Sequence, residues 1–178
     1  MTQALLAQLD FPEPVIGLTL FGSRARGDQV AESDHDILVW CEGGHPRTID
    51  SGMHSLAVYP RTFLIDLAIN GDLFVSHLVH EGKGIWDPQD LLGSLRQAFV
   101  PKQSYANEIE NAQAIGLFLL QFHPRLPSAL INRRIAWVVR TILIAKSAER
   151  GVPLFAAGPL AENLDAPEAT SLDRRAHV

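Results

Sequence analysis

Residues 18–40 of this 178-residue chain, LTLFGSRARGDQVAESDHDILVW, decide the fold that we expect. The apolar run Val15–Phe21 has the length of a strand and leads directly into Gly22 and Ser23. A second apolar run, His35–Trp40, follows after a polar connection. Short apolar runs bounded by turn residues are typical of buried strands. The segment therefore predicts two strands, with a glycine-serine turn at the end of the first.

Asp34 and Asp36 flank His35 where the second strand begins, and ten residues separate them from Ser23. Because side chains alternate along a strand, the two carboxylates are expected to project from the same face. Like charges this close repel each other, and a divalent cation between them removes the repulsion. Mg²⁺ prefers one or two carboxylates together with substrate phosphates. The pair therefore predicts a magnesium site, whereas His35 is expected to pack in a half-buried position.

The turn at Gly22 and Ser23 suits a phosphate group. Glycine lets the backbone approach a phosphate closely, and N–H groups at the start of a following helix can bind its oxygens. The Ser23 hydroxyl adds a donor. Arg24 and Arg26 follow in the sequence, and both suit either a phosphate contact or a solvated face.

A third carboxylate, Asp66, stands inside the apolar run FLIDLAI. We expect Thr62–Ile69 to form a strand, in which an unpaired carboxylate would be costly to bury. If this strand lies beside residues 35–40, Asp66 reaches the same cation, and three carboxylates would hold one or two Mg²⁺ ions. An edge-strand position facing solvent is the alternative.

Gly22-Ser23, ten intervening residues, Asp34-x-Asp36 and a strand carrying Asp66 resemble the nucleotidyltransferases of the DNA polymerase β superfamily. The motif is most similar to that of the small bacterial minimal nucleotidyltransferases and covers about residues 15–70. The resemblance implies an α+β fold, in which a small mixed β-sheet with flanking helices precedes a C-terminal helical hairpin or bundle.

The same resemblance implies Mg²⁺-dependent transfer of a nucleoside monophosphate to a hydroxyl of a protein or small molecule, with pyrophosphate released. AMP from ATP is the expected donor group. The implied catalytic and metal-binding residues are Asp34, Asp36 and Asp66. The implied nucleotide-binding residues are Gly22, Ser23, Arg24 and Arg26. The alternative function is an antitoxin-type module that binds a HEPN-type toxin, with weak or dispensable catalysis.

The rest of the chain suggests a nucleotidyltransferase domain over residues 1–100 and a helical domain over residues 101–178. We expect short helices over 2–10, 71–81 and 88–99, a strand over 84–86, and a short helix within the ambiguous region 43–60. Ser104 is expected to cap a long helix whose inward stripe is Ile109, Ala112, Ile115 and Leu119. A second long helix, ended by Gly151, is expected to pair with it and to pack Trp137 on the core. Residues 165–178 are expected to be frayed.

Composition and charge reduce the number of possible functions further. The net charge is −5 and the sequence pI is about 5.8, which makes a nucleic-acid partner less expected. The single cysteine, Cys41, excludes an internal disulfide framework. The N-terminus lacks the pattern of a signal peptide, and no apolar run has the length of a membrane span. We therefore expect a cytoplasmic protein without a membrane partner.

Overall fold

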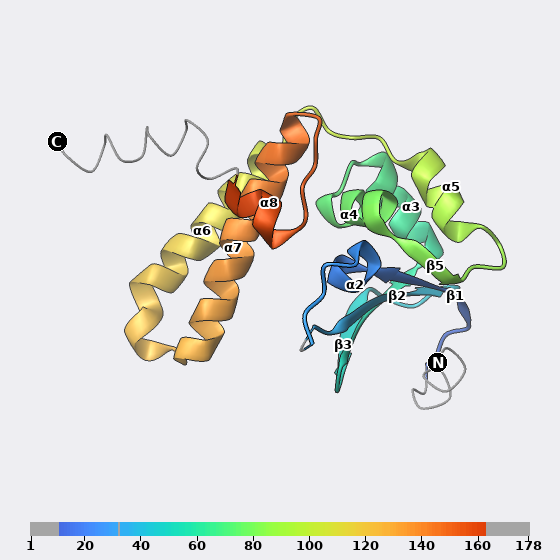
Figure 1. The fold of residues 1–178 in the computed structure, drawn as a ribbon, viewed down its shortest axis with the longest axis horizontal. Helices are drawn as coiled ribbons and strands as arrows, with labels where there is room; N and C mark the ends of the chain where they lie inside the picture. Colours follow the sequence, from blue (N-terminus) through green and yellow to red (C-terminus); the bar gives the residue numbers. More distant parts are fainter. Residues whose placement is uncertain (1–10, 32, 163–178) are drawn as a thin grey trace. The chain divides into compact units, whose positions relative to one another are not determined.

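The computed structural model describes residues 11–31 and 33–162. The helix expected over 2–10 and the frayed segment expected over 165–178 lie outside the described residues. The chain divides into two compact units, of which the first ends at Pro101 and the second begins at Lys102 (Figure 1). Each unit is described by itself.

A five-stranded mixed sheet forms the centre of the first unit, in the order β3-β4-β2-β1-β5. The β2 and β4 strands are parallel, whereas the β1–β2, β1–β5 and β3–β4 pairs are antiparallel. This mixed sheet with flanking helices confirms the predicted α+β class. The strands are β1 (Val15–Phe21), β2 (His35–Cys41), β3 (Arg47–Ser51), β4 (His54–Pro60) and β5 (Lys83–Trp86).

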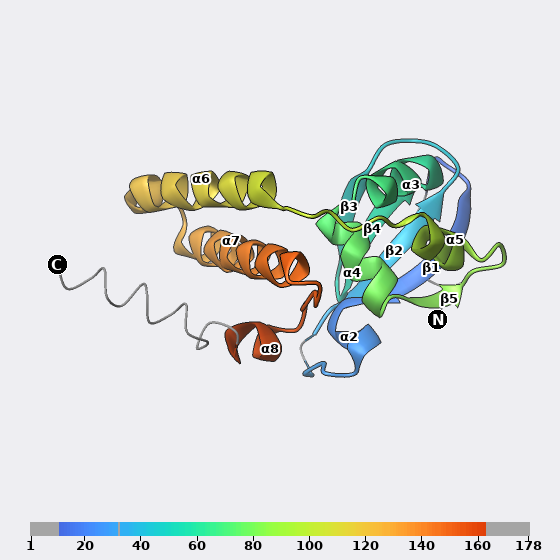
Figure 2. The same ribbon diagram turned by 90° about the horizontal axis from the view of Figure 1, so that it is seen from above.

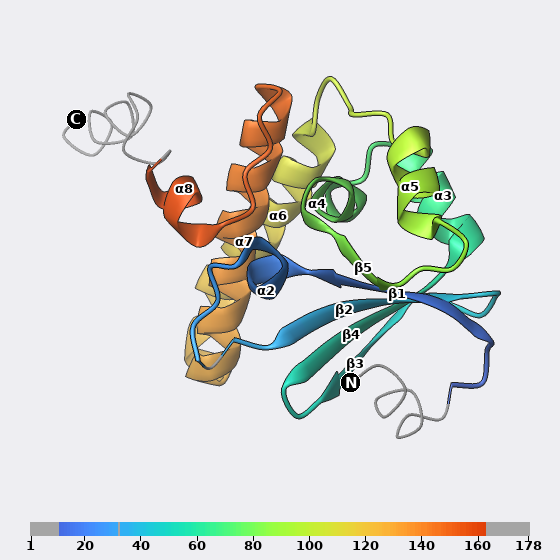
Figure 3. The same ribbon diagram turned by 45° about the vertical axis from the view of Figure 1, so that its right-hand side comes forward.

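Four helices accompany the sheet: α2 (Gly22–Arg26), α3 (Arg61–Ile69), α4 (Leu73–Glu81) and α5 (Leu91–Ala98). The last three cover one face of the sheet (Figure 3). The core beneath them contains Leu38 and Trp40 from β2, and the Trp40 indole N–H donates to the buried Thr19 hydroxyl at 2.9 Å. The opposite face carries a second apolar cluster that includes Ile37 and Leu56. The alternating side chains of β2 therefore supply both cores.

The strand predicted over Thr62–Ile69 is wrong, because Arg61–Ile69 is helix α3. A short apolar run fits a buried strand and a core helix equally well by pattern alone. In the helix, Leu64 and Ala68 stand four residues apart and are buried, whereas Asp66 faces outward and is exposed. The helical period thus leaves the Asp66 carboxylate in water, so it needs no partner to offset burial.

The short helix expected within 43–60 is also wrong, because this region forms the β3–β4 hairpin. β3 is an edge strand whose exposed and half-buried residues alternate, so its apolar signal is weak. Gly52 has a φ of +58° at the turn, a backbone conformation that glycine adopts without steric cost. The hairpin places Asp50 directly opposite Ser55.

The second unit contains α6 (Ala106–Phe122), the 3₁₀ turn η1 (His123–Arg125), α7 (Ser128–Glu149) and α8 (Ala157–Glu162). Figure 2 shows α6 and α7 side by side, as the two predicted long helices require. A Cβ on Gly116 would lie 3.2 Å from Val138 Cγ1, so the small residue permits a close approach of the two helices. The N-cap residue of α6 is Tyr105 and not Ser104, whose Oγ accepts a 3.3 Å bond from the Ala106 N–H. Gly151 follows the end of α7 with a φ of +78°.

The helical pair leaves several large apolar side chains in water. Ile115, expected on the inward stripe, is 41% exposed, and Trp137 is 46% exposed rather than packed on the core. Two helices can bury only one face of each other, and residues 114–120 in the C-terminal half of α6 are apolar on all sides. Further exposed apolar residues of the pair are Leu117, Phe118, Leu120, Leu130 and Val139. Within the described part of the chain, no single helix is long and apolar enough to cross a membrane.

Candidate nucleotide and metal site

The glycine-serine turn lies directly against one of the two predicted carboxylates. Phe21, the last residue of β1, is paired with Asp36 in the β1–β2 ladder, so the turn begins beside the start of β2. Gly22 is buried and has a φ of +71°. A Cβ at Gly22 would lie 2.2 Å from Asp36 Oδ2, which is closer than any real contact. The fold therefore brings Gly22 and Asp36 together, and the contact requires glycine.

Ser23 belongs to α2, a helix of only five residues. The N-cap residue is Phe21, whose side chain makes no capping hydrogen bond. The backbone N–H groups at this end are consequently not satisfied by a side-chain cap. At the other end, the Ser23 carbonyl accepts a 2.8 Å bond from Gly27, whose φ of +94° ends the helix. Ser23 itself is half-buried beside the turn.

Asp34 and Asp36 differ in their surroundings. Asp34 stands immediately before β2 and is exposed, whereas Asp36 is the second residue of the strand and is half-buried. Between them, His35 stacks on His54, its neighbour in the parallel ladder, with ring centroids 5.1 Å apart. The His35 N–H donates to the Met53 carbonyl at 2.7 Å and fixes the start of the strand. His35 thus packs in a half-buried position, as the sequence predicts.

Arg24 connects the turn to the segment that carries Asp34. Its guanidinium donates two hydrogen bonds to the Ser33 carbonyl, from Nε at 3.0 Å and from Nη2 at 2.7 Å. Ser33 directly precedes Asp34. The Ser33 hydroxyl also accepts a bond from the Val30 N–H at 3.0 Å, which stabilises the loop. Arg24 therefore links the two halves of the site through the backbone.

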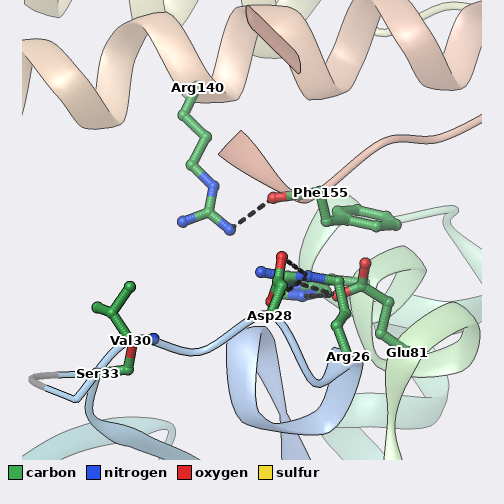
Figure 4. A network of polar contacts seen from close by, with 8 residues as sticks. Arg26, Asp28, Val30, Ser33, Glu81, Arg140 and Phe155 are labelled. Atoms are coloured by element: carbon green, nitrogen blue, oxygen red, sulfur yellow. Dashed lines mark hydrogen bonds and ion pairs between the residues drawn. The ribbon is translucent and has the colours of Figure 1, made fainter. Parts of the chain in front are cut away.

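Arg26 is held by two carboxylates (Figure 4). Its Nη1 donates to Glu81 Oε2 at 2.6 Å, and its Nε donates to the two Asp28 carboxylate oxygens at 3.2 and 3.1 Å. His77 Nε2 contacts the same Glu81 oxygen at 2.7 Å. Burial alone would raise the pKa of Glu81, but the bonds from His77 and Arg26 outweigh it and hold the pKa below its ordinary value.

Asp66 does not occupy the strand position that led to its prediction as a ligand. The strand parallel to β2 is β4, and the β4 residue in register with Asp36 is Ser55. Ser55 donates a 3.3 Å hydrogen bond to Asp50 on β3. Residues in register share one face of a sheet, so Asp36, Ser55 and Asp50 form a polar row across three strands. The strand position beside Asp36 is thus occupied by Ser55, and Asp66 lies on α3 instead.

The donor set that remains suits a hard cation bound together with a phosphate. Among residues 11–31 and 33–162, no group of three or more histidine, cysteine, aspartate or glutamate side chains is gathered to hold a metal ion. Asp34 and Asp36 supply two carboxylates, and Mg²⁺ commonly uses one or two and completes its shell with water and substrate oxygens. The pair therefore fits Mg²⁺ delivered with a nucleotide.

Sequence reasoning missed two side chains, those of Glu81 and Ser55. Glu81 lies 55 residues from its partner Arg26, and Ser55 lies in the hairpin region whose strands were not predicted. Ser55 has no local pattern that indicates a role, and Glu81 has only its i,i+4 spacing from His77. A further signal was charge, because Arg24 and Arg26 are cations beside a buried turn and need acceptors.

Residues 3–135 match the family model described as a nucleotidyltransferase domain. This match covers more than half of the chain, which therefore belongs to the nucleotidyltransferase domain family. The Gly22-Ser23 and Asp34-x-Asp36 motif lies within the matched residues, so the family resemblance predicted from the motif is confirmed. No curated protein matches the chain significantly.

Two solved structures are similar to the chain at low identity. A nucleotidyltransferase-like protein from Exiguobacterium sibiricum 255-15 is 15% identical with a TM-score of 0.40, over 99% of this chain and 66% of that chain. A toxin–antitoxin structure with AMP-PNP is 19% identical with a TM-score of 0.35, over 67% of this chain and 95% of that chain. Similarities this weak carry no information on substrate or partner.

Proposed function

We propose that the protein transfers a nucleoside monophosphate, AMP from ATP, to a hydroxyl group of a protein or small molecule, as a member of the minimal nucleotidyltransferase group. The observation that carries the proposal is the contact between Gly22 and Asp36. It joins a backbone turn suited to phosphate and a carboxylate suited to Mg²⁺. The family membership gives the reaction class.

In this proposal the Gly22-Ser23 turn binds the triphosphate, and Asp34 and Asp36 hold Mg²⁺. The ion, when bound, neutralises phosphate charge and polarises the reacting phosphoryl group. The half-buried Asp36 stays oriented by its place in β2, and Asp34 is exposed immediately before the strand. The acceptor oxygen forms a bond to the α-phosphorus, the bond between the α-phosphorus and the bridging oxygen breaks, and pyrophosphate and the acceptor proton are released.

The test is label transfer from α-labelled and γ-labelled ATP with Mg²⁺ against candidate protein and small-molecule acceptors. Transfer from the α-labelled nucleotide alone supports nucleotidyl transfer, whereas transfer from the γ-labelled nucleotide indicates phosphoryl transfer and contradicts the proposal. The double variant Asp34→Ala/Asp36→Ala is the control. Label that still reaches the acceptor with this variant contradicts the assigned site.

A partner-binding role of the antitoxin type is the second candidate. The observation that favours it is the set of large apolar side chains exposed on α6 and α7, including Leu117 and Trp137. A HEPN-type toxin is the partner that the family resemblance implies. Stable copurification with such a partner, undiminished in the Asp34→Ala/Asp36→Ala variant, would favour binding without catalysis. Loss of the partner's modification in that variant would favour the enzyme.

A further inference from the structure

The nucleotide turn is held by a helix too short to be stable alone. α2 contains five residues, and a single helical turn gains too few hydrogen bonds to offset the entropy of ordering its backbone. Its position must therefore come from tertiary contacts. Ala25 supplies one of these, because it is 1% exposed. Arg24 supplies a second by donating to the Ser33 carbonyl, and Arg26, the last residue of the helix, supplies a further one through its guanidinium.

The contacts of Arg26 reach a distant helix. Glu81 is the final residue of α4, and its carboxylate binds Arg26 across a separation of 55 residues. The side chains of Arg26 and Glu81 are only 17% and 14% exposed, so water screens this pair less than a surface ion pair. His77, four residues before Glu81, contacts the same carboxylate oxygen and restricts its rotation.

The charge of Arg26 is already compensated within the first unit. Glu81 and Asp28 bind two different edges of the guanidinium, at Nη1 and at Nε (Figure 4). A guanidinium engaged by two carboxylates offers less net positive charge to a phosphate than one facing solvent. This geometry favours a supporting role for Arg26 over direct contact with the nucleotide.

We infer that Glu81 is a positioning residue for the nucleotide turn, acting through Arg26. This inference rests on the proposed function, because it concerns the same turn. Glu81 anchors Arg26, Arg26 fixes α2, and α2 holds Gly22 and Ser23 in the conformation that receives the triphosphate. Arg26 is then a structural link between α2 and α4 and not a phosphate ligand.

The two roles of Arg26 predict opposite results for the substitution Glu81→Gln. If Arg26 is a structural link, this variant loosens the turn and weakens nucleotide binding. If Arg26 is a phosphate ligand restrained by Glu81, the same variant frees the guanidinium, and nucleotide binding is unchanged or tighter. Arg26→Lys weakens binding in both cases, so the Glu81 variant discriminates between them.

The experiment measures the Kd of an Mg²⁺-bound ATP analogue with a non-cleavable α–β bridge by calorimetry. The proteins are the full chain and its Glu81→Gln, Arg26→Lys and combined variants. We expect each single variant to weaken binding roughly fivefold or more. The combined variant should weaken binding little beyond either single variant, because the two substitutions remove the same linkage. Glu13→Gln is the matched control, since Glu13 forms an ion pair with Arg47 at the same 2.6 Å distance. Unchanged or tighter binding by Glu81→Gln overturns the inference.

Hydrogen exchange of residues 22–28 supplies a readout that does not depend on nucleotide binding. We expect faster exchange in Glu81→Gln than in the wild type, and no change in Glu13→Gln. If Glu81→Gln does not fold, His77→Gln serves in its place and should move both readouts in the same direction. If the wild type binds no nucleotide, the proposed function fails, whereas exchange still tests the linkage. Unchanged exchange in a folded variant overturns the inference.

Discussion

Gly22 and Asp36 are packed so closely that a single methyl group at Gly22 would lie 2.2 Å from Asp36 Oδ2. The contact joins the end of β1 to the start of β2, and it forms because Phe21 and Asp36 are partners in the antiparallel ladder. The turn that we propose for phosphate and the carboxylate that we propose for Mg²⁺ are therefore direct neighbours. A change on either side should disturb the other.

We expect Gly22→Ala to damage both stability and metal binding. Alanine at a φ of +71° is strained, and its methyl group would displace the Asp36 carboxylate. The expected loss in the free energy of unfolding is about 1–3 kcal/mol. Denaturant unfolding measures this loss, and Mn²⁺ titration in the presence of nucleotide measures the metal affinity.

The matched control for Gly22→Ala is Gly27→Ala. Gly27 also has a positive φ, of +94°, but a Cβ there meets nothing within 4 Å. Gly27→Ala should therefore lose stability without losing metal affinity. Equal loss of metal affinity in the two variants would show that backbone strain, rather than the contact with Asp36, is responsible.

We expect Asp36→Asn to reduce nucleotidyl transfer by about 100-fold or more, because it removes a charged ligand from a site with two carboxylates. Asp66→Asn should leave transfer within about twofold of wild type, because Asp66 is exposed on α3 and is not in register with Asp36. Label transfer at saturating Mg²⁺ measures both. A large loss in Asp66→Asn would restore the third-carboxylate role that the sequence predicted.

Arg24→Lys should weaken the connection between the turn and the segment before β2. Arginine donates two bonds to the Ser33 carbonyl, whereas lysine cannot reproduce this fork. The expected loss in the free energy of unfolding is about 1 kcal/mol. Arg125→Lys, at an exposed position of η1, is the control for an arginine replacement and should change stability by less than about 0.5 kcal/mol. Equal losses in the two variants would contradict a structural role for the two bonds from Arg24 to the Ser33 carbonyl.

A buried tryptophan, Trp40, and an exposed one, Trp137, provide a further test of packing. Trp40 is 1% exposed and donates to the Thr19 hydroxyl, so Trp40→Phe leaves a void and breaks a buried hydrogen bond. We expect a loss of about 1–3 kcal/mol. Trp137→Phe, on the exposed side of α7, should cost less than about 0.5 kcal/mol. Thermal unfolding measures the loss of stability in both variants. A larger loss in Trp137→Phe than in Trp40→Phe would contradict the difference in burial between the two residues.

The sequence predicts those elements whose pattern has one physical interpretation. Val15–Phe21 and His35–Trp40 are apolar runs between turn residues, and both are strands. The run FLIDLAI also lies between turn residues, Pro60 and Asn70-Gly71, but its pattern fits a core helix as well as a strand, so the predictions of a strand and of a strand position for Asp66 both failed. The β4 strand was missed because it begins with two polar residues and ends in a proline. The Arg26–Glu81 linkage could not be predicted, because only the folded backbone brings residues 55 positions apart into contact.

The Glu81 linkage should also give the protein a specific pH dependence. The pKa of Glu81 is lower in the folded protein than its ordinary value of 4.5, so the folded state favours the ionised form. A lowered carboxyl pKa contributes stability at a pH above the unfolded-state value, and this contribution disappears as the pH falls through the folded-state value. The free energy of unfolding of wild type should therefore exceed that of Glu81→Gln near pH 7. The difference should shrink below a pH of about 4.5. Urea unfolding at a series of pH values measures this difference, and a difference that stays constant down to about pH 3 would contradict an ionised Glu81 as the anchor of Arg26.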